Sequence, residues 1–316
     1  MPEGNEIHRW AERHRSAFVG KKMHVESPNG RTEDTERLDG RVLEKVLAHG
    51  KHLGYVFGKD RILHVHLGRY GDWTEGQMPL AEVKGVLRLR MWRAGARARV
   101  DQAEATTRHG WYSSDDGSST VAPENVDWLE LRGASDCSVW TDAQWEQLIE
   151  RLGPDPLGST GEPAGDVPDD PGPAFERIAK TKKPICVLLM EQDVIAGIGN
   201  IYRAELLYRE RLNPMTPGNE VPVASLKRIW KDSIPLMKAG MVDRRIITTR
   251  PKDRPTKKAG LPLKEEAHYV YRRHGKPCFV CGTKVLKTDI AGRTLYWCPV
   301  CQQGPHADRE VGVAVQ

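Results

Sequence analysis

The spacing of side chains along the chain changes from a helical period to a strand-like one. Near the start, the residues of one face recur every three or four positions, which predicts an amphipathic helix. They are Ile7, Trp10, Ala11, His14, Ala17 and Phe18. From about residue 23 to residue 100 the apolar runs shorten and are bounded by Gly, Asn and Asp, which favours a β-sandwich or barrel. These runs are Met23–Val25, Gly40–Leu47, Leu53–Phe57, Ile62–Leu67 and Val86–Trp92.

The second half of the chain returns to helical spacing. A capping box at Thr141 and Gln144 predicts the start of a short helix. Residues 153–173 hold six Pro and five Gly, so we expect a surface loop there, neither helix nor central strand. Helical spacing then extends over residues 174–240, whereas residues 101–124 lack periodicity and predict a loop insertion.

Length and composition limit the class of protein. The chain has 316 residues, which suits two domains with a small third unit, and 39% hydrophobic residues allow real cores. No apolar run approaches the length of a membrane span, which excludes a transmembrane helix. The N-terminal segment carries acids and lacks an apolar core, so we expect no secretory signal and a cytoplasmic protein.

Four of the six cysteines form two matched pairs with the pattern C-x2-C-x16-C-x2-C. Four thiolates bind zinc tetrahedrally, and such a closed site leaves no coordination position for catalysis. Residues 284–289 and 294–297 predict two strands of a zinc ribbon, so we expect one structural zinc ion per chain. A redox dithiol pair is the alternative, which the matched spacing disfavours. Cys137 and Cys186 are expected to be buried apolar fillers. The predicted ligands are Cys278, Cys281, Cys298 and Cys301.

Charge is unevenly distributed along the chain. The net charge is +5, but the segment between residues 251 and 301 contains eleven Lys and Arg and only four Asp and Glu. The loop at 153–173 has five acids and no base. A basic stretch beside a metal unit indicates a polyanionic partner. A solvated charged face is the alternative interpretation.

A glycine-rich segment precedes a predicted helix at Asn200. In residues 194–202 (VIAGIGNIY), the glycines permit a turn that brings backbone N–H groups and a helix N-terminus near a ligand. Such a turn suits a phosphate, and Asn200 adds a side-chain donor. The pattern is not that of a dinucleotide-binding fold, so we expect no nucleotide cofactor. A plain glycine-rich turn between two helices would give the same pattern.

The N-terminus itself is a candidate nucleophile. Met1 precedes Pro2, and an initiator methionine is normally removed before such a small residue. A terminal amine has a pKa near 8, so part of it is unprotonated at neutral pH and can attack C1′ of a sugar. Glu3 lies beside it as a proton donor or acceptor. Taken alone, the pattern is common in proteins that use it for nothing.

Three further features are ambiguous in isolation. Lys51, in HGKH, reads as a surface lysine at the start of a strand. Arg293 lies at the tip of the predicted ribbon hairpin, where a solvated residue is the simpler interpretation. His64 and His66 face one side of a strand but lack a third metal ligand nearby. We therefore expect His66 near phosphate or in packing.

Taken together, these motifs resemble those of one family, the formamidopyrimidine-DNA glycosylase and endonuclease VIII group of base-excision repair enzymes. The resemblance covers PEGNEIHR, HGKHL, HVHLGRYG, LMEQDVIAGIGNIYRAELL and the four-cysteine ribbon, in the family's order. It implies an α+β fold with DNA bound between its parts. The expected parts are an N-terminal helix and β-sandwich (1–138), a helix–two-turn–helix domain (139–250) and a basic loop with a zinc finger (251–316).

The resemblance also implies catalytic roles. Pro2 would be the Schiff-base nucleophile, and Glu3 would protonate the leaving sugar or base. Lys51 would contact the phosphate beside the lesion and assist the chemistry. Arg293 would hold the phosphate that flanks the flipped nucleotide, and Asn200 would bind backbone phosphate at the helix entry.

Other positions of the family's pattern match less closely. Glu6 corresponds to a second acid near the pocket. The turn at Arg69 and Tyr70 takes the place of the wedge that fills the void left by the flipped base, where the family has apolar or amide side chains. Arg69 is therefore a departure. The insertion at 101–124 and the acidic loop at 153–173 are longer than the family usually carries.

The implied activity is that of a bifunctional glycosylase and abasic-site lyase. It would release an oxidised base and then cut the strand by β- and δ-elimination. PEG at the start, where PEL is the other form, resembles the endonuclease VIII branch, which favours oxidised pyrimidines. We expect damaged DNA as the partner of a nucleoid-associated monomer, and no membrane. The alternatives are a purine-preferring enzyme of the same family and a non-catalytic zinc-ribbon binder of damaged DNA, which would need no free terminal proline.

Overall fold

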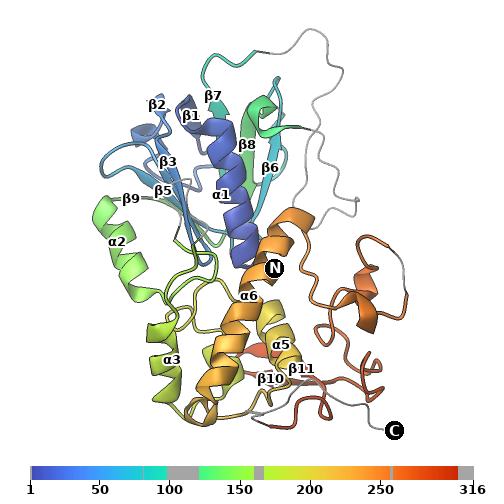
Figure 1. Ribbon diagram of the computed structural model, residues 1–316. Helices are drawn as coiled ribbons and strands as arrows, with labels where there is room; N and C mark the ends of the chain where they lie inside the picture. The colour runs from blue at the N-terminus through green and yellow to red at the C-terminus, as the bar shows by residue number, and fades with distance from the viewer. Residues whose placement is uncertain (1, 81, 98–120, 160–166, 257–258, 305–316) are drawn as a thin grey trace. The chain divides into compact units, whose positions relative to one another are not determined.

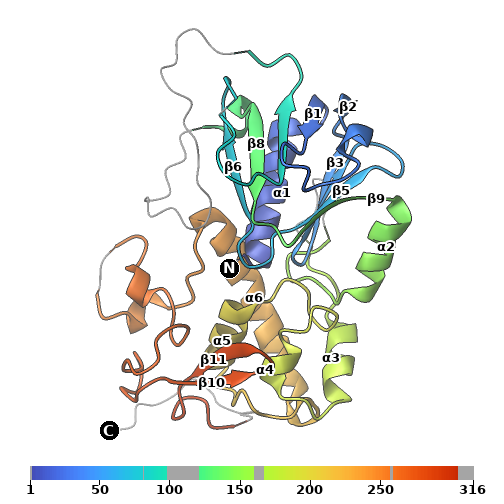
Figure 2. The same ribbon diagram turned by 180° about the vertical axis from the view of Figure 1, so that it is seen from behind.

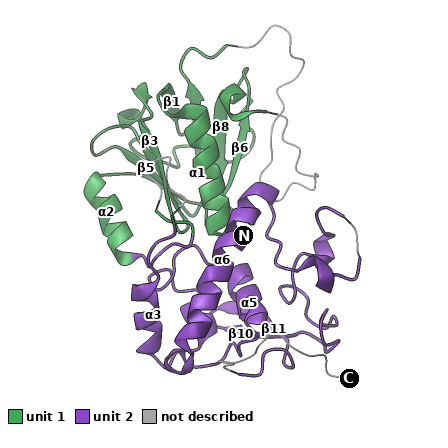
Figure 3. Cartoon of the chain, viewed as in Figure 1, with its two compact units in different colours: residues 1–151, 157–167 green, residues 152–156, 168–316 purple. Residues whose placement is uncertain are grey.

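The computed structural model describes residues 2–80, 82–97, 121–159, 167–256 and 259–304 (Figure 1). The chain divides into two compact units (Figure 3). The first contains residues 1–151 and 157–167, and the second contains residues 152–156 and 168–316. Most of the predicted insertion at 101–124 and the middle of the loop at 153–173 lie outside the described residues.

The first unit begins with helix α1 (Gly4–Phe18), which packs against strands of the sandwich (Figures 1 and 2). The six side chains predicted to share one helix face are all buried, which confirms the amphipathic pattern. His14 is fully buried, and its Nδ1 lies 2.7 Å from the Tyr55 hydroxyl. Burial, together with the charges of Arg13 and Arg9, holds the pKa of His14 well below its ordinary value. This imidazole is therefore a neutral core residue.

Two antiparallel sheets form the sandwich. Alternate side chains of each strand point into the shared core, as a strand's period of two requires. The five-stranded sheet has the order β2 (Arg41–Val42), β1 (Lys22–Glu26), β7 (Leu89–Arg93), β8 (Trp128–Arg132) and β6 (Asp72–Gly76). The four-stranded sheet has the order β3 (Lys45–His49), β4 (His52–Val56), β5 (Ile62–His66) and β9 (Asp136–Trp140).

The strand prediction was incomplete in two respects. The predicted run Gly40–Leu47 is two strands, because β2 pairs with β1 whereas β3 pairs with β4, so the chain changes sheets between them. Strands β6, β8 and β9 were not predicted. In β8 the buried Glu130 interrupts the apolar pattern, and its carboxylate accepts a hydrogen bond of 2.9 Å from Arg90 Nε. In β6 the buried Glu75 is bound by Arg13 at 2.5 Å.

Helix α2 (Asp142–Arg151) closes the first unit, and its capping box is confirmed. The Gln144 backbone N–H donates to Thr141 Oγ1 at 3.3 Å. In return, Gln144 Oε1 accepts from the Thr141 backbone N–H at 2.8 Å. Both orphan donors at the helix start are thus satisfied by the side chains that the sequence pattern indicated.

The second unit is mainly helical. Helix α3 begins at Gly172, so the prediction that residues 153–173 contain no helix was wrong at their last two positions. Proline fits the first turn of a helix, where its missing N–H is not needed.

Over the described residues, no helix is long and apolar enough to cross a membrane. The elements are α3 (Gly172–Ala179), α4 (Ile185–Leu188), α5 (Asn200–Arg209), α6 (Val223–Asp243), β10 (Leu286–Ile290) and β11 (Arg293–Trp297). Short 3-10 helices are Thr35–Arg37, Pro123–Asn125, Gly218–Glu220, Pro251–Asp253 and Lys264–Glu266.

Candidate functional site

The predicted nucleophile and acid lie together at the head of α1. Pro2 is buried, and Glu3 is 0% exposed. Glu3 occupies the N-cap in an extended conformation, and its carbonyl accepts the Glu6 backbone N–H at 3.0 Å. Its side chain makes no cap hydrogen bond. Glu3 thus follows Pro2 directly at the N-terminus of the helix, where the helix dipole creates a partial positive charge.

Glu6 has a different environment from Glu3. Its carboxylate forms a bidentate ion pair with Arg9, at 3.1 Å from Nε and 2.5 Å from Nη2. The Arg9 guanidinium also lies over the Trp10 ring, 4.1 Å from its centroid. Burial opposes the charge on Arg9, but the Glu6 carboxylate keeps the pKa of Arg9 above its ordinary value. The structure thus places Glu6 next to the N-terminus as one half of a buried ion pair.

Lys51 lies in the turn between β3 and β4. His49 and His52 are paired across the two strands, so Gly50 and Lys51 alone form the turn. Gly50 has φ +57°, which favours glycine at the first central position of a two-residue hairpin. Lys51 is half-buried at the second position. The glycine therefore fixes where the lysine leaves the hairpin.

The turn after β5 presents the two residues predicted to act as a wedge. Arg69 and Tyr70 are both exposed, Tyr70 by 70%, and the Arg69 guanidinium lies 5.4 Å from the Tyr70 ring centroid. A Cβ atom at Gly71 would lie 2.2 Å from the Leu67 carbonyl oxygen. Only glycine fits there, because the chain doubles back sharply at this turn. The turn leaves the Tyr70 ring and the Arg69 guanidinium in contact at its tip.

His66 is not placed as a cation. Its Nδ1 lies 2.6 Å from Ser135 Oγ, and Ser135 Oγ donates to the His66 carbonyl at 2.9 Å. Burial and the nearby charges of His64 and Lys51 lower the pKa of His66. A neutral ring in this arrangement donates from Nδ1, so Nε2 is left as an acceptor.

In the second unit, the glycine-rich turn leads into α5 as predicted. The Gln192 side chain holds the turn: its Oε1 accepts the Gly197 backbone N–H at 3.1 Å, and its Nε2 donates to the Ile198 carbonyl at 2.9 Å. Gly199 is the N-cap, and Asn200 is the first helical residue. Asn200 is 8% exposed, and its Nδ2 donates to the Thr294 carbonyl in β11 at 3.0 Å. This side chain ties the helix entry to the ribbon hairpin.

Arg293 begins strand β11 and is exposed. The two-residue turn before it, Ala291–Gly292, has positive φ at both positions, as a tight hairpin of this twist requires. Because Asn200 donates to the carbonyl of Thr294, the residue after Arg293, the start of α5 is bonded to the start of β11. The structure therefore brings these two predicted residues together.

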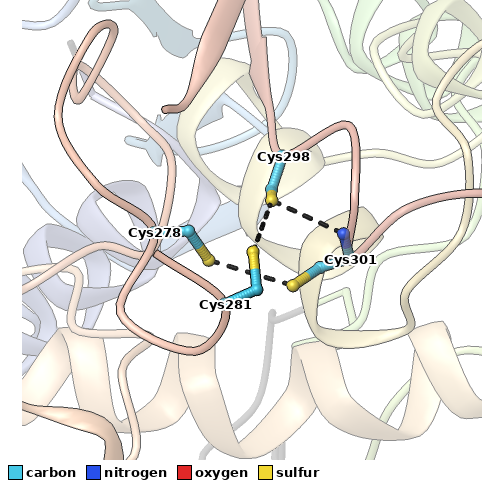
Figure 4. A group of neighbouring side chains, drawn as sticks. All are labelled: Cys278, Cys281, Cys298 and Cys301. Atoms are coloured by element: carbon cyan, nitrogen blue, oxygen red, sulfur yellow. Dashed lines mark hydrogen bonds between the residues drawn. The ribbon is translucent and has the colours of Figure 1, made fainter. Parts of the chain in front are cut away.

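The four ligand cysteines converge in two knuckles whose sulfurs point toward one another (Figure 4). All four Sγ atoms lie within 4.8 Å of one another, with 3.9 Å between Cys278 and Cys301 and 3.4 Å between Cys281 and Cys298. Zinc–sulfur bonds of about 2.3 Å in a tetrahedron require sulfur–sulfur distances of about 3.8 Å. The cluster fits one structural zinc ion. Among the residues that the structure describes, no other set of three or more such ligands converges.

Two residues of α5 connect the helix to the finger, and neither was predicted. Glu205 is 0% exposed, and its carboxylate accepts backbone N–H groups from Tyr269, Val270 and Tyr271 at 2.7–2.8 Å. The Tyr208 hydroxyl lies 3.0 Å from Cys278 Sγ, where it can donate to a zinc-bound thiolate. The available signal was an acid and a phenol beside the apolar residues Ala204, Leu206 and Leu207 of the helix, but the sequence does not identify their partners.

Comparison with known proteins agrees with this arrangement. The formamidopyrimidine-DNA glycosylase N-terminal domain matches residues 1–109. The formamidopyrimidine-DNA glycosylase H2TH domain matches residues 152–251, and the zinc finger found in FPG and IleRS matches residues 275–304. The fold and its zinc centre are thus those of a DNA glycosylase with a helix–two-turn–helix domain.

Full-length relatives establish the family. Endonuclease 8 1 of Mycobacterium tuberculosis and that of Mycobacterium bovis are each 38% identical to this chain over 307 residues, covering 96% of it and 100% of their own length. The chain belongs to the formamidopyrimidine-DNA glycosylase and endonuclease VIII family of bifunctional glycosylase-lyase enzymes, and is endonuclease VIII-like.

Solved structures share the fold. A Lactococcus lactis FPG variant in complex with Fapy-dG-containing DNA superposes with a TM-score of 0.69 at 22% identity, covering 96% of this chain and 100% of that one. MutM (FPG) from Thermus thermophilus superposes with a TM-score of 0.67 at 23% identity, covering 96% and 99%.

Proposed function

We propose that this enzyme excises oxidised bases from DNA, preferentially oxidised pyrimidines, and then cuts the strand at the resulting abasic site. The observation that carries the proposal is the placement of Pro2 and Glu3, both buried, at the head of α1. The pyrimidine preference is supported by the PEG start and by the 38% identity to Endonuclease 8 1. The damaged nucleotide must leave the duplex stack, because C1′ is inaccessible inside it.

In the proposed mechanism, the Pro2 amine is exposed by removal of Met1. Its nitrogen forms a bond to C1′ while the glycosidic bond breaks and the base leaves with a proton. Glu3 supplies a proton to the opening sugar or the departing base. The resulting iminium acidifies C2′, so loss of that proton expels the 3′ phosphate, and a second elimination expels the 5′ phosphate.

The phosphate contacts are proposed for residues of both units. Lys51 would contact the phosphate beside the lesion, and its fixed turn position suits this role. Arg293 would hold the flanking phosphate, while the N-terminus of α5 at Asn200 offers backbone N–H groups to another. At the turn after β5, the exposed Tyr70 ring, with Arg69 against it, would fill the space of the flipped base.

The lesion preference is tested by borohydride trapping on matched duplexes. We expect the covalent adduct to form faster on a duplex with an oxidised pyrimidine than on the same sequence with an oxidised purine. An abasic duplex serves as the common positive control. Faster trapping on the purine would support the second candidate, a purine-preferring enzyme of the same family. Lactococcus lactis FPG structures hold Fapy-dG in one case and an oxidised pyrimidine in another, so the fold alone does not decide between the two lesions. Absence of an adduct on every duplex would favour the non-catalytic binder.

Binding should weaken steeply with salt, because each phosphate contact releases condensed counterions. Arg293→Ala should reduce the slope of log affinity against log salt by about 1. Affinity is measured on abasic-analogue DNA over a series of salt concentrations. Lys287→Ala, also on the ribbon hairpin but on β10, is the matched control and should leave the slope nearer to that of the parent. A slope unchanged by Arg293→Ala would remove this residue from the phosphate contacts.

A further inference from the structure

A row of polar side chains crosses the end of the four-stranded sheet. His49 pairs with His52, His52 with His66, and His66 with Asp136, so one residue comes from each strand. Their strand neighbours on the opposite face belong to the hydrophobic core, so the row lies on the outer face. The core-facing neighbours are Ala48, Leu53, Val65 and Cys137. His64 lies on the same outer face, two residues before His66 in β5.

His64 connects two members of this row. Its Nδ1 lies 2.6 Å from Asp136 Oδ2, and its Nε2 lies 2.9 Å from His52 Nδ1. The His64 ring is 3% exposed and stacks on Trp140, with centroids 3.8 Å apart and planes 20° apart. Ser138 Oγ donates to the same Asp136 oxygen at 3.0 Å. We call Asp136, His64 and His52 the histidine bridge.

The ionised carboxylate of Asp136 determines which ring nitrogen of His64 carries a proton. The hydrogen bond from His64 lowers the pKa of Asp136, so this carboxylate is ionised and can only accept. His64 must therefore carry its proton on Nδ1. When His64 is neutral, its Nε2 accepts, and His52 Nδ1 donates to it. Burial, with the charges of His66 and His64, lowers the pKa of His52 to about 2, so His52 itself stays neutral.

The histidine bridge ends at the turn that carries Lys51. His52 follows Lys51 directly and closes the two-residue turn by pairing with His49. The Lys51 charge contributes to the lowered pKa of both His52 and His66, which places it within electrostatic reach of both rings. The hydrogen bonds of the histidine bridge thus hold His52, the residue next to Lys51. Because the His52 ring is neutral, it adds no second positive charge beside the lysine.

We propose that the histidine bridge positions Lys51 for its phosphate contact, with His64 and His52 as positioning residues. The inference rests on the proposed role of Lys51 in the reaction. The hydrogen bonds set the direction of the β3–β4 turn, and the neutral His52 ring adds no second positive charge beside the lysine. Neither histidine touches the reacting atoms in this role.

A double-mutant cycle tests this coupling. The single-turnover rate of strand cleavage on an abasic duplex is measured for Lys51→Ala, His64→Gln and the double variant. A displaced contact can cost up to about a hundred-fold in rate, so we expect His64→Gln to slow cleavage ten-fold or more. Because His64 acts through Lys51, the double variant should be no slower than Lys51→Ala. Losses that multiply in the double variant would show a separate structural role and overturn the inference.

A second pair of variants covers the case in which His64→Gln fails to fold. The Asp136 side chain is 42% exposed, so the fold tolerates its replacement. Asp136→Ala removes the acceptor for His64 Nδ1 and should slow cleavage, again only when Lys51 is present. Asp136→Asn keeps an acceptor oxygen and should retain most of the rate. Equal rates for the parent and Asp136→Ala would overturn the inference.

The first unit offers a matched control. His24 Nδ1 lies 3.1 Å from Asp39 Oδ1, and the ring stacks on Trp92 with centroids 5.1 Å apart. It thus shares a carboxylate partner and a stacked tryptophan with His64, although its side chain is 38% exposed. His24→Gln should cleave at the parent rate. If Lys51→Ala itself cleaves at the parent rate, the proposed role of Lys51 fails. If Lys51→Ala is slow while His64→Gln is not, the inference alone fails.

Discussion

Blocking the Pro2 amine should abolish both base release and strand cleavage. A chain that retains one or two extra residues before Pro2 has no terminal secondary amine at that position, so no iminium can form there. Loss of a nucleophile typically lowers enzymatic rates by more than about a thousand-fold. The measurement is borohydride trapping on an abasic duplex, read as a covalent band on a denaturing gel. The same preparation, cleaved by a protease to expose Pro2, should regain the band.

Glu3→Gln separates the nucleophile from the acid. It should release damaged bases poorly, because the amide cannot supply the proton, yet still form an adduct with DNA that is already abasic.

For the chains whose Pro2 amine is blocked, binding of the abasic duplex is measured in parallel to show that they still bind their substrate. A trapped band from a chain with a verified block at Pro2 would assign the nucleophile to another amine.

Removal of zinc should abolish lesion processing while the first unit remains folded. Zinc bound to four thiolates contributes on the order of 10 kcal/mol to the folding of small fingers. Cys298→Ser or chelation should therefore unfold the finger, displace Arg293 and eliminate detectable cleavage. Zinc content is measured by elemental analysis, and the first unit is followed by the near-ultraviolet dichroism of its buried tryptophans, Trp10, Trp73 and Trp128.

Cys186→Ser is the matched control for the zinc experiment. Cys186 is a 0% exposed cysteine of the same unit but lies outside the ligand cluster. This variant should keep its zinc and its cleavage activity. Full cleavage by protein whose zinc loss has been verified would defeat the assignment of the finger to DNA binding.

The elements predicted best were those with local patterns. The period of α1 and the capping box of α2 involve residues three or four apart. The two C-x2-C pairs are equally local, and their spacing is typical of a zinc site. Strands β6 and β8 escaped prediction because each buries a carboxylate whose cationic partner lies far away in the sequence. Glu75 meets Arg13, and Glu130 meets Arg90. In the sequence, the two members of a buried ion pair are indistinguishable from exposed charged residues.

The same limit applies to the site. Pro2, Glu3 and the cysteines are recognisable because their chemistry is local. The contact of Asn200 with Thr294 and the bond between His64 and Asp136 depend on pairings across 94 and 72 positions. Strand register decides these pairings, and no local pattern reveals it. The sequence therefore indicated which residues to expect in the reaction, whereas the structure was needed to find the hydrogen-bond partners of Asn200 and His64.

The buried carboxylate of Glu205 also has a consequence for the order of assembly. Its three backbone partners lie 64 to 66 positions further along the chain. During synthesis the helix leaves the ribosome long before these partners, so its carboxylate stays hydrated until they arrive. Contacts of such long range form late, since the loop between them must first close. The proposed nucleophile is thus synthesised first and the zinc finger last, so a prematurely ended chain would carry the proposed reactive amine without the proposed DNA contacts of the finger.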